Sequence, residues 1–229
     1  MSAGPNVLAL DAATEACSAA LQVGEHRTER YAVMPRGHAQ HLLGMVDKLL
    51  QEAHLEPDQL DLIVYGRGPG AFTGVRIGVG VAQGLAFGAD CPVYGVSTLE
   101  AVAQGCFRRN GAKHVLVAMD ARMGEVYWAA CSLDSASGSM QALGEESVAL
   151  PADVRCPNGW TEWFAAGTGW SAHAQALASA CGQPPLGREP DALPRALDLL
   201  PHGLAALRRG TVDSPEQAQP VYLRDKVTS

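Results

Sequence analysis

The sequence has little positive charge. Lysine and arginine together number 17 against 24 aspartate and glutamate residues, and the formal net charge is −7 at pH 7. The basic residues form no run beyond the pairs Arg108-Arg109 and Arg208-Arg209. Because affinity for nucleic acid comes mainly from clustered Lys and Arg side chains that neutralise phosphates, the composition predicts that the chain alone does not bind nucleic acid strongly.

The chain also lacks paired cysteine motifs and long apolar runs. Its six cysteines are scattered without a Cys-x-x-Cys pair, which predicts reduced, buried thiols in a cytoplasmic protein rather than disulfides or a zinc site. We expect no membrane span and no signal peptide, because no apolar run is long enough and the first six residues have the wrong composition. Since 47% of the residues are hydrophobic, a sizeable core is expected.

Glycine, by contrast, is concentrated between Tyr65 and Gly88, in the stretch YGRGPGAFTGVRIGVGVAQGLAFG. Its first part, 66–70, can be neither helix nor regular strand, because glycine and proline impose special backbone angles. A short apolar strand precedes this turn, and a helix at about 73–87 follows it. The turn is no Walker A loop and meets the dinucleotide fingerprint only loosely, with Ala71 in place of the third glycine. A tight phosphate-binding turn stays open as the weaker interpretation.

The helix at 73–87 is apolar on nearly all sides although it contains several glycines. Each interior glycine costs up to ~1 kcal/mol relative to alanine, and a helix that is apolar all round is buried all round. One side can pack on the chain's own sheet. We predict that the other side, together with an amphipathic helix at 40–53, forms an association face; an ordinary core helix is the alternative. The predicted face comprises Leu42, Gly44, Met45, Val46, Leu49, Gly74, Gly78, Val79, Val81, Gly84 and Leu85.

Strand and helix patterns follow one another in the order βββαβαβα, and the first three strands are predicted to be antiparallel. The opening strand, Val7 to Asp11, is echoed at Val115 to Asp120, since both end in Asp-Ala and return through a short turn as another strand. Such a repeat predicts two related units in tandem. We expect an N-terminal lobe at 1–105, which carries the association helices, and a smaller C-terminal lobe at 106–229.

Six blocks of sequence, in order, carry a resemblance to a known family: LDAATEACSAAL, GRGPGAFTGVRIGVGVAQGLA, YGVSTLEAVA, DARMGEVYWA, AGTGW and PVYLR. They resemble the TsaB family, the dimerisation subunits of the bacterial machinery that places threonylcarbamoyl on adenosine 37 of tRNA. The resemblance implies an α/β, actin-like (ASKHA) fold with two RNase-H-like βββαβα lobes, the second reduced. It also implies TsaD as catalytic partner, the ATPase TsaE in a larger complex, a homodimer when alone, and contact with tRNA only through the complex.

The residues that carry catalysis in related enzymes are largely replaced in this sequence. Such relatives hold a metal through a His-x-x-x-His pair, whereas Thr98 and Val102 stand at the corresponding positions here, and valine cannot ligate a metal. Asp11 and Asp120 stand where actin-like ATPases hold phosphate. Neither is followed by a glycine within three positions, so they are weak candidates for a cofactor site, and hydrogen bonding within their turns is favoured.

We therefore expect no catalytic residue, no metal and no cofactor. The sequence predicts a non-catalytic subunit that supports the catalytic subunit in tRNA modification. The alternatives are a degenerate actin-like nucleotide-binding hydrolase, a metallopeptidase-like protein, and a homodimeric structural protein.

Overall fold

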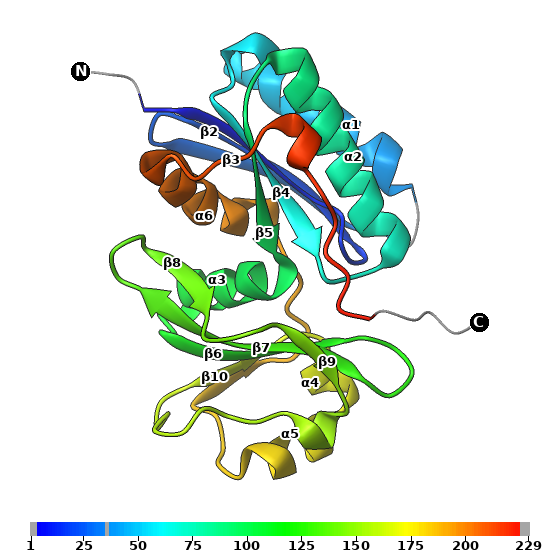
Figure 1. Cartoon of the computed structure of the whole chain (residues 1–229), viewed down its shortest axis with the longest axis vertical. Coiled ribbons are helices and arrows are strands. Elements are labelled where there is room, and N and C mark those ends of the chain that lie inside the picture. Colours follow the sequence, from blue (N-terminus) through cyan, green and yellow to red (C-terminus); the bar gives the residue numbers. More distant parts are fainter. Residues whose placement is uncertain (1–3, 35–36, 225–229) are drawn as a thin grey trace. The chain divides into compact units, whose positions relative to one another are not determined.

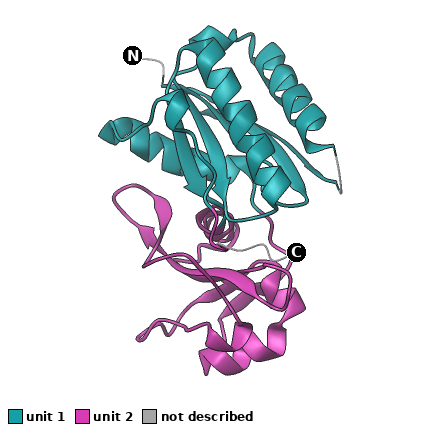
Figure 2. Ribbon diagram, turned by 45° about the vertical axis from the view of Figure 1, so that its right-hand side comes forward, with its two compact units in different colours: residues 1–98, 194–221 teal, residues 99–193, 222–229 magenta. Residues whose placement is uncertain are grey.

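The structure is a computed structural model that describes residues 4–34 and 37–224. The chain forms two compact units (Figure 2). Unit 1 contains Met1–Thr98 and Pro194–Val221, and unit 2 contains Leu99–Leu193 and Tyr222–Ser229. Among the described residues, no helix is long and apolar enough to cross a membrane.

Unit 1 is built on a five-stranded sheet in the order β3-β2-β1-β4-β5. The chain first forms an antiparallel meander of three strands, as predicted, and then adds two strands parallel to the first. The strands are β1 (Asn6–Asp11), β2 (Ala16–Val23), β3 (His26–Val33), β4 (Leu62–Gly68) and β5 (Val93–Ser97). Strand β1 is central and nearly all buried, which explains its continuous apolar sequence.

Three helices cover this sheet: α1 (His38–Ala53), α2 (Phe72–Ala89) and α6 (Ala196–Arg209). Helices α1 and α2 lie side by side on one face, where they share a core with Ile63 and Tyr65 of β4 (Figure 1). Helix α6 packs on β1 and β4, and a Cβ atom at Gly203 would contact Leu62 and Val64. Because successive strand residues point to opposite faces, α6 covers the other face. The short 3₁₀ helices η1 (Pro57–Gln59) and η3 (Pro215–Gln217) flank α2.

Unit 2 repeats the same strand arrangement with its own residues. Its sheet runs β11-β10-β6-β7-β8, with β9 also paired to β7, and β6 takes the central place that β1 has in unit 1. The elements are β6 (His114–Asp120), β7 (Val126–Asp134), β8 (Ser139–Ala142), β9 (Ser147–Ala149), η2 (Pro151–Asp153), β10 (Phe164–Ala166), α4 (Gly169–Ala172), α5 (Ala174–Cys181) and β11 (Gly187–Glu189). No α-helix lies between β9 and β10 within these described residues, so the second repeat is reduced, as predicted.

The boundary between the units differs from the expected division at residue 105. Helix α3 (Thr98–Asn110) packs Leu99, Val102 and Cys106 into a cluster with strand β6, and from Leu99 onward it belongs to unit 2. Helix α6 follows β11 in sequence but belongs to unit 1. The two units are therefore not the contiguous lobes 1–105 and 106–229 that the sequence predicted. A helix belongs to the unit whose sheet its apolar side covers, whatever its place in the sequence.

The start of α6 is fastened to the antiparallel strands by one buried carboxylate. The Arg195 guanidinium pairs with Glu29 of β3 at 2.5 Å, and its Nε also donates to the same oxygen at 3.0 Å. The backbone N–H of Leu197 donates to the other Glu29 oxygen at 3.1 Å. Glu29 therefore neutralises a cation and satisfies a free N–H group in the first turn of the helix.

We expect Glu29→Ala to lower the free energy of unfolding of unit 1 by ~2 kcal/mol, because it leaves two charge-assisted donors without their acceptor. Urea denaturation followed by circular dichroism measures the change. Glu25→Ala, in the exposed turn before β3, is the matched control and should change stability by less than ~0.5 kcal/mol. Equal stability of the two variants would show that α6 is held by its apolar side alone.

Candidate functional site

The turn after β1 is enclosed by the chain's own glycines. A Cβ atom at Gly66 would lie 2.0 Å from Oδ2 of Asp11, one at Gly70 2.2 Å from the Ala13 carbonyl oxygen, and one at Gly74 2.2 Å from the Ala12 carbonyl oxygen. Real Cβ atoms do not approach so closely, so each position has room for hydrogen only. The glycines at 66, 70 and 74 thus allow the segment from β4 into α2 to close directly over the Asp11 turn.

This enclosure bears on whether the glycine-rich turn could hold a phosphate group. Asp11, Ala12 and Ala13 are each no more than 1% exposed, and the Ala13 carbonyl accepts a hydrogen bond from the Ala71 N–H at 2.8 Å. A phosphate group needs free backbone N–H groups and open space beside them. Here the space beside Gly66, Gly70 and Gly74 is filled by the chain's own atoms, which favours internal packing as the role of these glycines.

Asp11 itself is a buried carboxyl group with one unsatisfied oxygen. Its Oδ1 accepts the Ala13 N–H at 3.1 Å, while Oδ2 has no hydrogen-bond partner among the described residues. Burial raises the pKa of the carboxyl from 3.8 to about 7, and the hydrogen bond from Ala13 offsets only part of this rise. Asp11 is therefore a proton-binding group of the core near neutral pH.

Asp120 ends strand β6 in the equivalent place of unit 2, in a more open setting. Its Oδ1 accepts the Arg122 N–H at 3.0 Å and lies 3.9 Å from Nε2 of His173, while its own N–H donates to Oγ1 of Thr168 at 3.1 Å. The following turn is strained, because Arg122 and Met123 both have positive φ.

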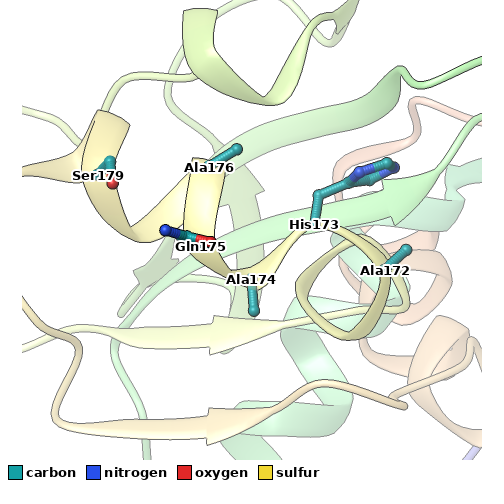
Figure 3. A pocket seen from close by; sticks show the side chains of 6 residues that line it. All are labelled: Ala172, His173, Ala174, Gln175, Ala176 and Ser179. Carbon is teal, nitrogen blue, oxygen red and sulfur yellow. The ribbon is translucent and has the colours of Figure 1, made fainter.

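His173 also lines a shallow hollow at the corner between α4 and α5, where the lining is otherwise mostly alanine, with Gln175 and Ser179 as further polar members (Figure 3). Its imidazole points away from the Gln175 side chain in this view. The hydrogen bonds of Asp120 to Arg122 and Thr168 are of the kind that aspartate makes in turns. Within residues 4–34 and 37–224, no group of three or more His, Cys, Asp or Glu side chains could hold a metal ion.

The two positions that replace the histidine pair of catalytic relatives lie at the start of α3. Thr98 and Val102 are each 1% exposed, and Oγ1 of Thr98 has no hydrogen-bond partner in the part of the chain that the structure describes. Val102 packs in the core cluster of α3 and β6. An apolar side chain in a packed core offers no lone pair to a metal, so this helix start has a structural role.

The predicted association face divides into residues that point inward and residues that point outward. Six of the eleven are buried within unit 1 and are removed from the surface: Leu42, Val46, Leu49, Gly74, Gly78 and Val79. Gly44 and Gly84 are exposed, and Met45, Val81 and Leu85 are half-buried. For α2, the sequence contains no signal for this division, since an apolar helix does not indicate which of its sides meets its own sheet.

The exposed side of α2 has a feature that the predicted list largely missed. Gly80, Gly84 and Gly88 follow one another at intervals of four, and a Cβ atom at any of them would have no neighbour within 4 Å. Exposed large hydrophobic side chains accompany them, with Phe87 on α2 and Leu43 on α1 about half exposed. We call Gly80, Gly84 and Gly88 the glycine ridge. The spacing of four was the sequence signal that could have identified it.

The comparisons with known proteins agree with this structure. A family model described as "TsaD: tRNA N6-adenosine threonylcarbamoyltransferase" matches residues 25–224. A protein of Escherichia coli K12 named "tRNA threonylcarbamoyladenosine biosynthesis protein TsaB" is 43% identical over 96% of this chain and 95% of that protein. The chain belongs to the TsaB family. The TsaB protein of Haemophilus influenzae is 38% identical over 97% of this chain and 94% of that protein.

A solved structure extends the TsaB assignment to the fold. YeaZ from Pseudomonas aeruginosa superimposes with a TM-score of 0.89 at 46% identity, covering 96% of this chain and 100% of that one. Together with the repeated strand order of the two units, this match confirms the predicted α/β, actin-like fold of two RNase-H-like repeats.

Proposed function

We propose that this TsaB-family chain is a non-catalytic subunit that binds and supports the catalytic subunit TsaD in the N6-threonylcarbamoyladenosine modification of tRNA position 37. The names of its relatives place them in the biosynthesis of threonylcarbamoyladenosine in tRNA. The filled turn at Asp11 and the apolar surroundings of Val102 support a role without catalysis. Metal-dependent ATP turnover or threonylcarbamoyl transfer by the purified chain alone would contradict this role.

The glycine ridge carries the proposal of a docking surface. Gly74 sits against backbone of its own chain and has no alternative residue, whereas Gly80, Gly84 and Gly88 have no such neighbour. Each of the three still lowers helix stability by up to ~1 kcal/mol relative to alanine. Packing against a helix from another chain would offset this cost, because glycine lets two helix backbones approach closely.

The docking surface consists of the outward sides of α1 and α2, which lie side by side over the sheet (Figure 1). Leu43 and Gly44 on α1 and Phe87 on α2 are also exposed on these two helices. The same surface serves a homodimer when the chain is alone, so the homodimer and the TsaD complex compete. TsaE joins the larger assembly in the cytoplasm. With a net charge of −7, the chain meets tRNA only through that complex.

The test is a bulky substitution on the ridge. We expect Gly84→Leu to remain folded, because nothing lies within 4 Å of the added Cβ, and to lose both the homodimer and TsaD capture with at least a ~10-fold weaker apparent affinity. Sedimentation velocity and co-purification with TsaD measure the two losses. Gly144→Leu, at an equally open and exposed glycine of unit 2, is the control. A folded Gly84→Leu variant that still dimerises and captures TsaD would place the contact elsewhere.

A further inference from the structure

The buried carboxyl of Asp11 is connected to the first turn of α2 by a short chain of hydrogen bonds. Oδ1 of Asp11 accepts the Ala13 N–H at 3.1 Å, and the Ala13 carbonyl accepts the N–H of Ala71 at 2.8 Å. The Ala71 carbonyl in turn accepts the Val75 N–H at 2.9 Å, within the first turn of α2. The Asp11 turn therefore holds the start of the helix that carries the glycine ridge.

The two charge states of Asp11 fit this arrangement unequally. Oδ2 is directed at Gly66, is buried, and has no hydrogen-bond partner. A neutral acid leaves one weak polar group unsatisfied, whereas a carboxylate leaves a buried negative charge that needs donors or water. The enclosure offers no space beside Gly66, so ionisation is accommodated only when the turn moves away from the segment between β4 and α2.

We propose that loss of the Asp11 proton loosens the start of α2 and weakens association through the α1–α2 surface, which makes Asp11 a pH switch for the subunit contact. The switch rests on the proposed docking function. Burial raises the pKa of this carboxyl to about 7, so it gains and loses its proton near neutral pH. Association is then strongest at mildly acidic pH and weakens as the pH rises.

Other titratable and charged groups lie in the same turn or on elements packed around it. They include Glu15, Cys17, His38, Tyr65, Arg67, Arg76, Asp198, His202, Arg208 and Arg209. Burial raises the pKa of the Cys17 thiol to about 11 and lowers that of His202 to about 4, so neither changes charge between pH 6 and 8.5. His38 is the histidine closest to the turn, since its Nε2 lies 3.0 Å from the Thr14 carbonyl oxygen, and it therefore needs a control variant.

The experiment measures self-association and TsaD binding of the full chain at pH 6, 7 and 8.5. The wild type should bind on the order of tenfold more weakly at pH 8.5 than at pH 6. Asp11→Asn, which keeps the shape but cannot ionise, should show less than a twofold change. His38→Gln and the surface variant Asp58→Asn should behave as the wild type. A pH dependence that survives in Asp11→Asn, or that disappears in His38→Gln, overturns the proposal.

Two measurements keep the proposal falsifiable if Asp11→Asn folds poorly. Calorimetric titration of the wild type with TsaD at pH 7.5, in buffers of different ionisation enthalpy, should show net proton uptake on binding; zero uptake refutes the switch. Hydrogen exchange of the peptide containing Ala71, in the free chain and corrected for intrinsic rates, should rise with pH. If this exchange rises with pH but Gly84→Leu still binds TsaD, the proposed docking surface is wrong while the loosening of the α2 start is supported. If the exchange does not change with pH, the loosening itself is refuted.

Discussion

Alanine at Gly74 is expected to destabilise unit 1 by ~3 kcal/mol or more, whereas alanine at Gly84, in the same helix, is expected to stabilise it by up to ~1 kcal/mol. The Cβ at position 74 would meet the Ala12 carbonyl oxygen at 2.2 Å, and that oxygen belongs to buried backbone that cannot turn aside. At position 84 the Cβ meets nothing, so only the helix propensity of alanine remains. The same Gly→Ala substitution is thus expected to destabilise unit 1 at position 74 and to stabilise it at position 84.

Urea denaturation followed by far-ultraviolet circular dichroism measures both changes. The chain supplies an internal control, because its four tryptophans, at 128, 160, 163 and 170, all lie in unit 2. Tryptophan fluorescence therefore reports unit 2 and should give nearly the same midpoint in both variants if the units unfold separately. Gly70→Ala, which meets the Ala13 carbonyl oxygen at 2.2 Å, should repeat the loss seen at Gly74. A stable Gly74→Ala variant would mean that the turn at Ala12 is not held closed.

The contrast between Gly74 and Gly84 also shows how far the sequence leads. The strand-turn-helix unit, the three antiparallel strands and the repeat of the Asp strands were all predictable, because local patterns of apolar residues and glycines determine them. The role of each glycine was not. Whether a glycine faces the Asp11 turn, as Gly74 does, or open space, as Gly84 does, depends on the rotation of α2 about its axis. That rotation is set by contacts with residues some sixty positions earlier in the chain.

Other parts of the site depended on long-range contacts in the same way. Asp11 and Asp120 look alike in sequence, yet the first is enclosed by glycines of β4, α2 and the segment between them, whereas the second is partly exposed beside His173. Leu42, Val46 and Leu49 form the regular stripe of an amphipathic helix, and such a stripe faces the chain's own core before it faces a partner. Gly80 and Gly88 differ from these residues, because a Cβ atom at either position would have no neighbour within 4 Å.

The free energy of unfolding of unit 1 is expected to show little net contribution from Asp11 and His202 between pH 4 and 6.5, because the two buried groups have opposite effects. Burial raises the pKa of Asp11 from 3.8 to about 7, so its folded form binds a proton that the unfolded chain has lost, and stability falls as pH rises toward 7. Burial, helped by the nearby charge of Arg209, lowers the pKa of His202 from 6.5 to about 4. Here the unfolded chain binds the extra proton, so stability falls as pH drops from 6.5 to 4.

Single variants should uncover the two opposed slopes. Each group contributes about 1.4 kcal/mol per pH unit within its window. Asp11→Asn leaves the histidine effect and should lose roughly 3 kcal/mol more than the wild type on acidification from pH 6.5 to 4. His202→Met leaves the aspartate effect and should lose roughly 3 kcal/mol more than the wild type as the pH rises from 4 to 6.5. Comparing slopes rather than absolute stabilities cancels the other titrating groups and any packing cost of the substitutions.

Urea denaturation of the wild type, both single variants and the double variant at half-unit pH steps measures these slopes. Between pH 4 and 6.5 the profile of the double variant should again run parallel to that of the wild type, because both proton-linked contributions are gone. His54→Met, at an exposed histidine just after α1, should leave the profile unchanged. Parallel profiles for the wild type and Asp11→Asn would mean that Asp11 is ionised within the folded unit, and the carboxyl would then need a donor or an ordered water at Oδ2. That result would also remove the physical basis for proton control of the α2 start, since an already ionised Asp11 has no proton to lose near neutral pH.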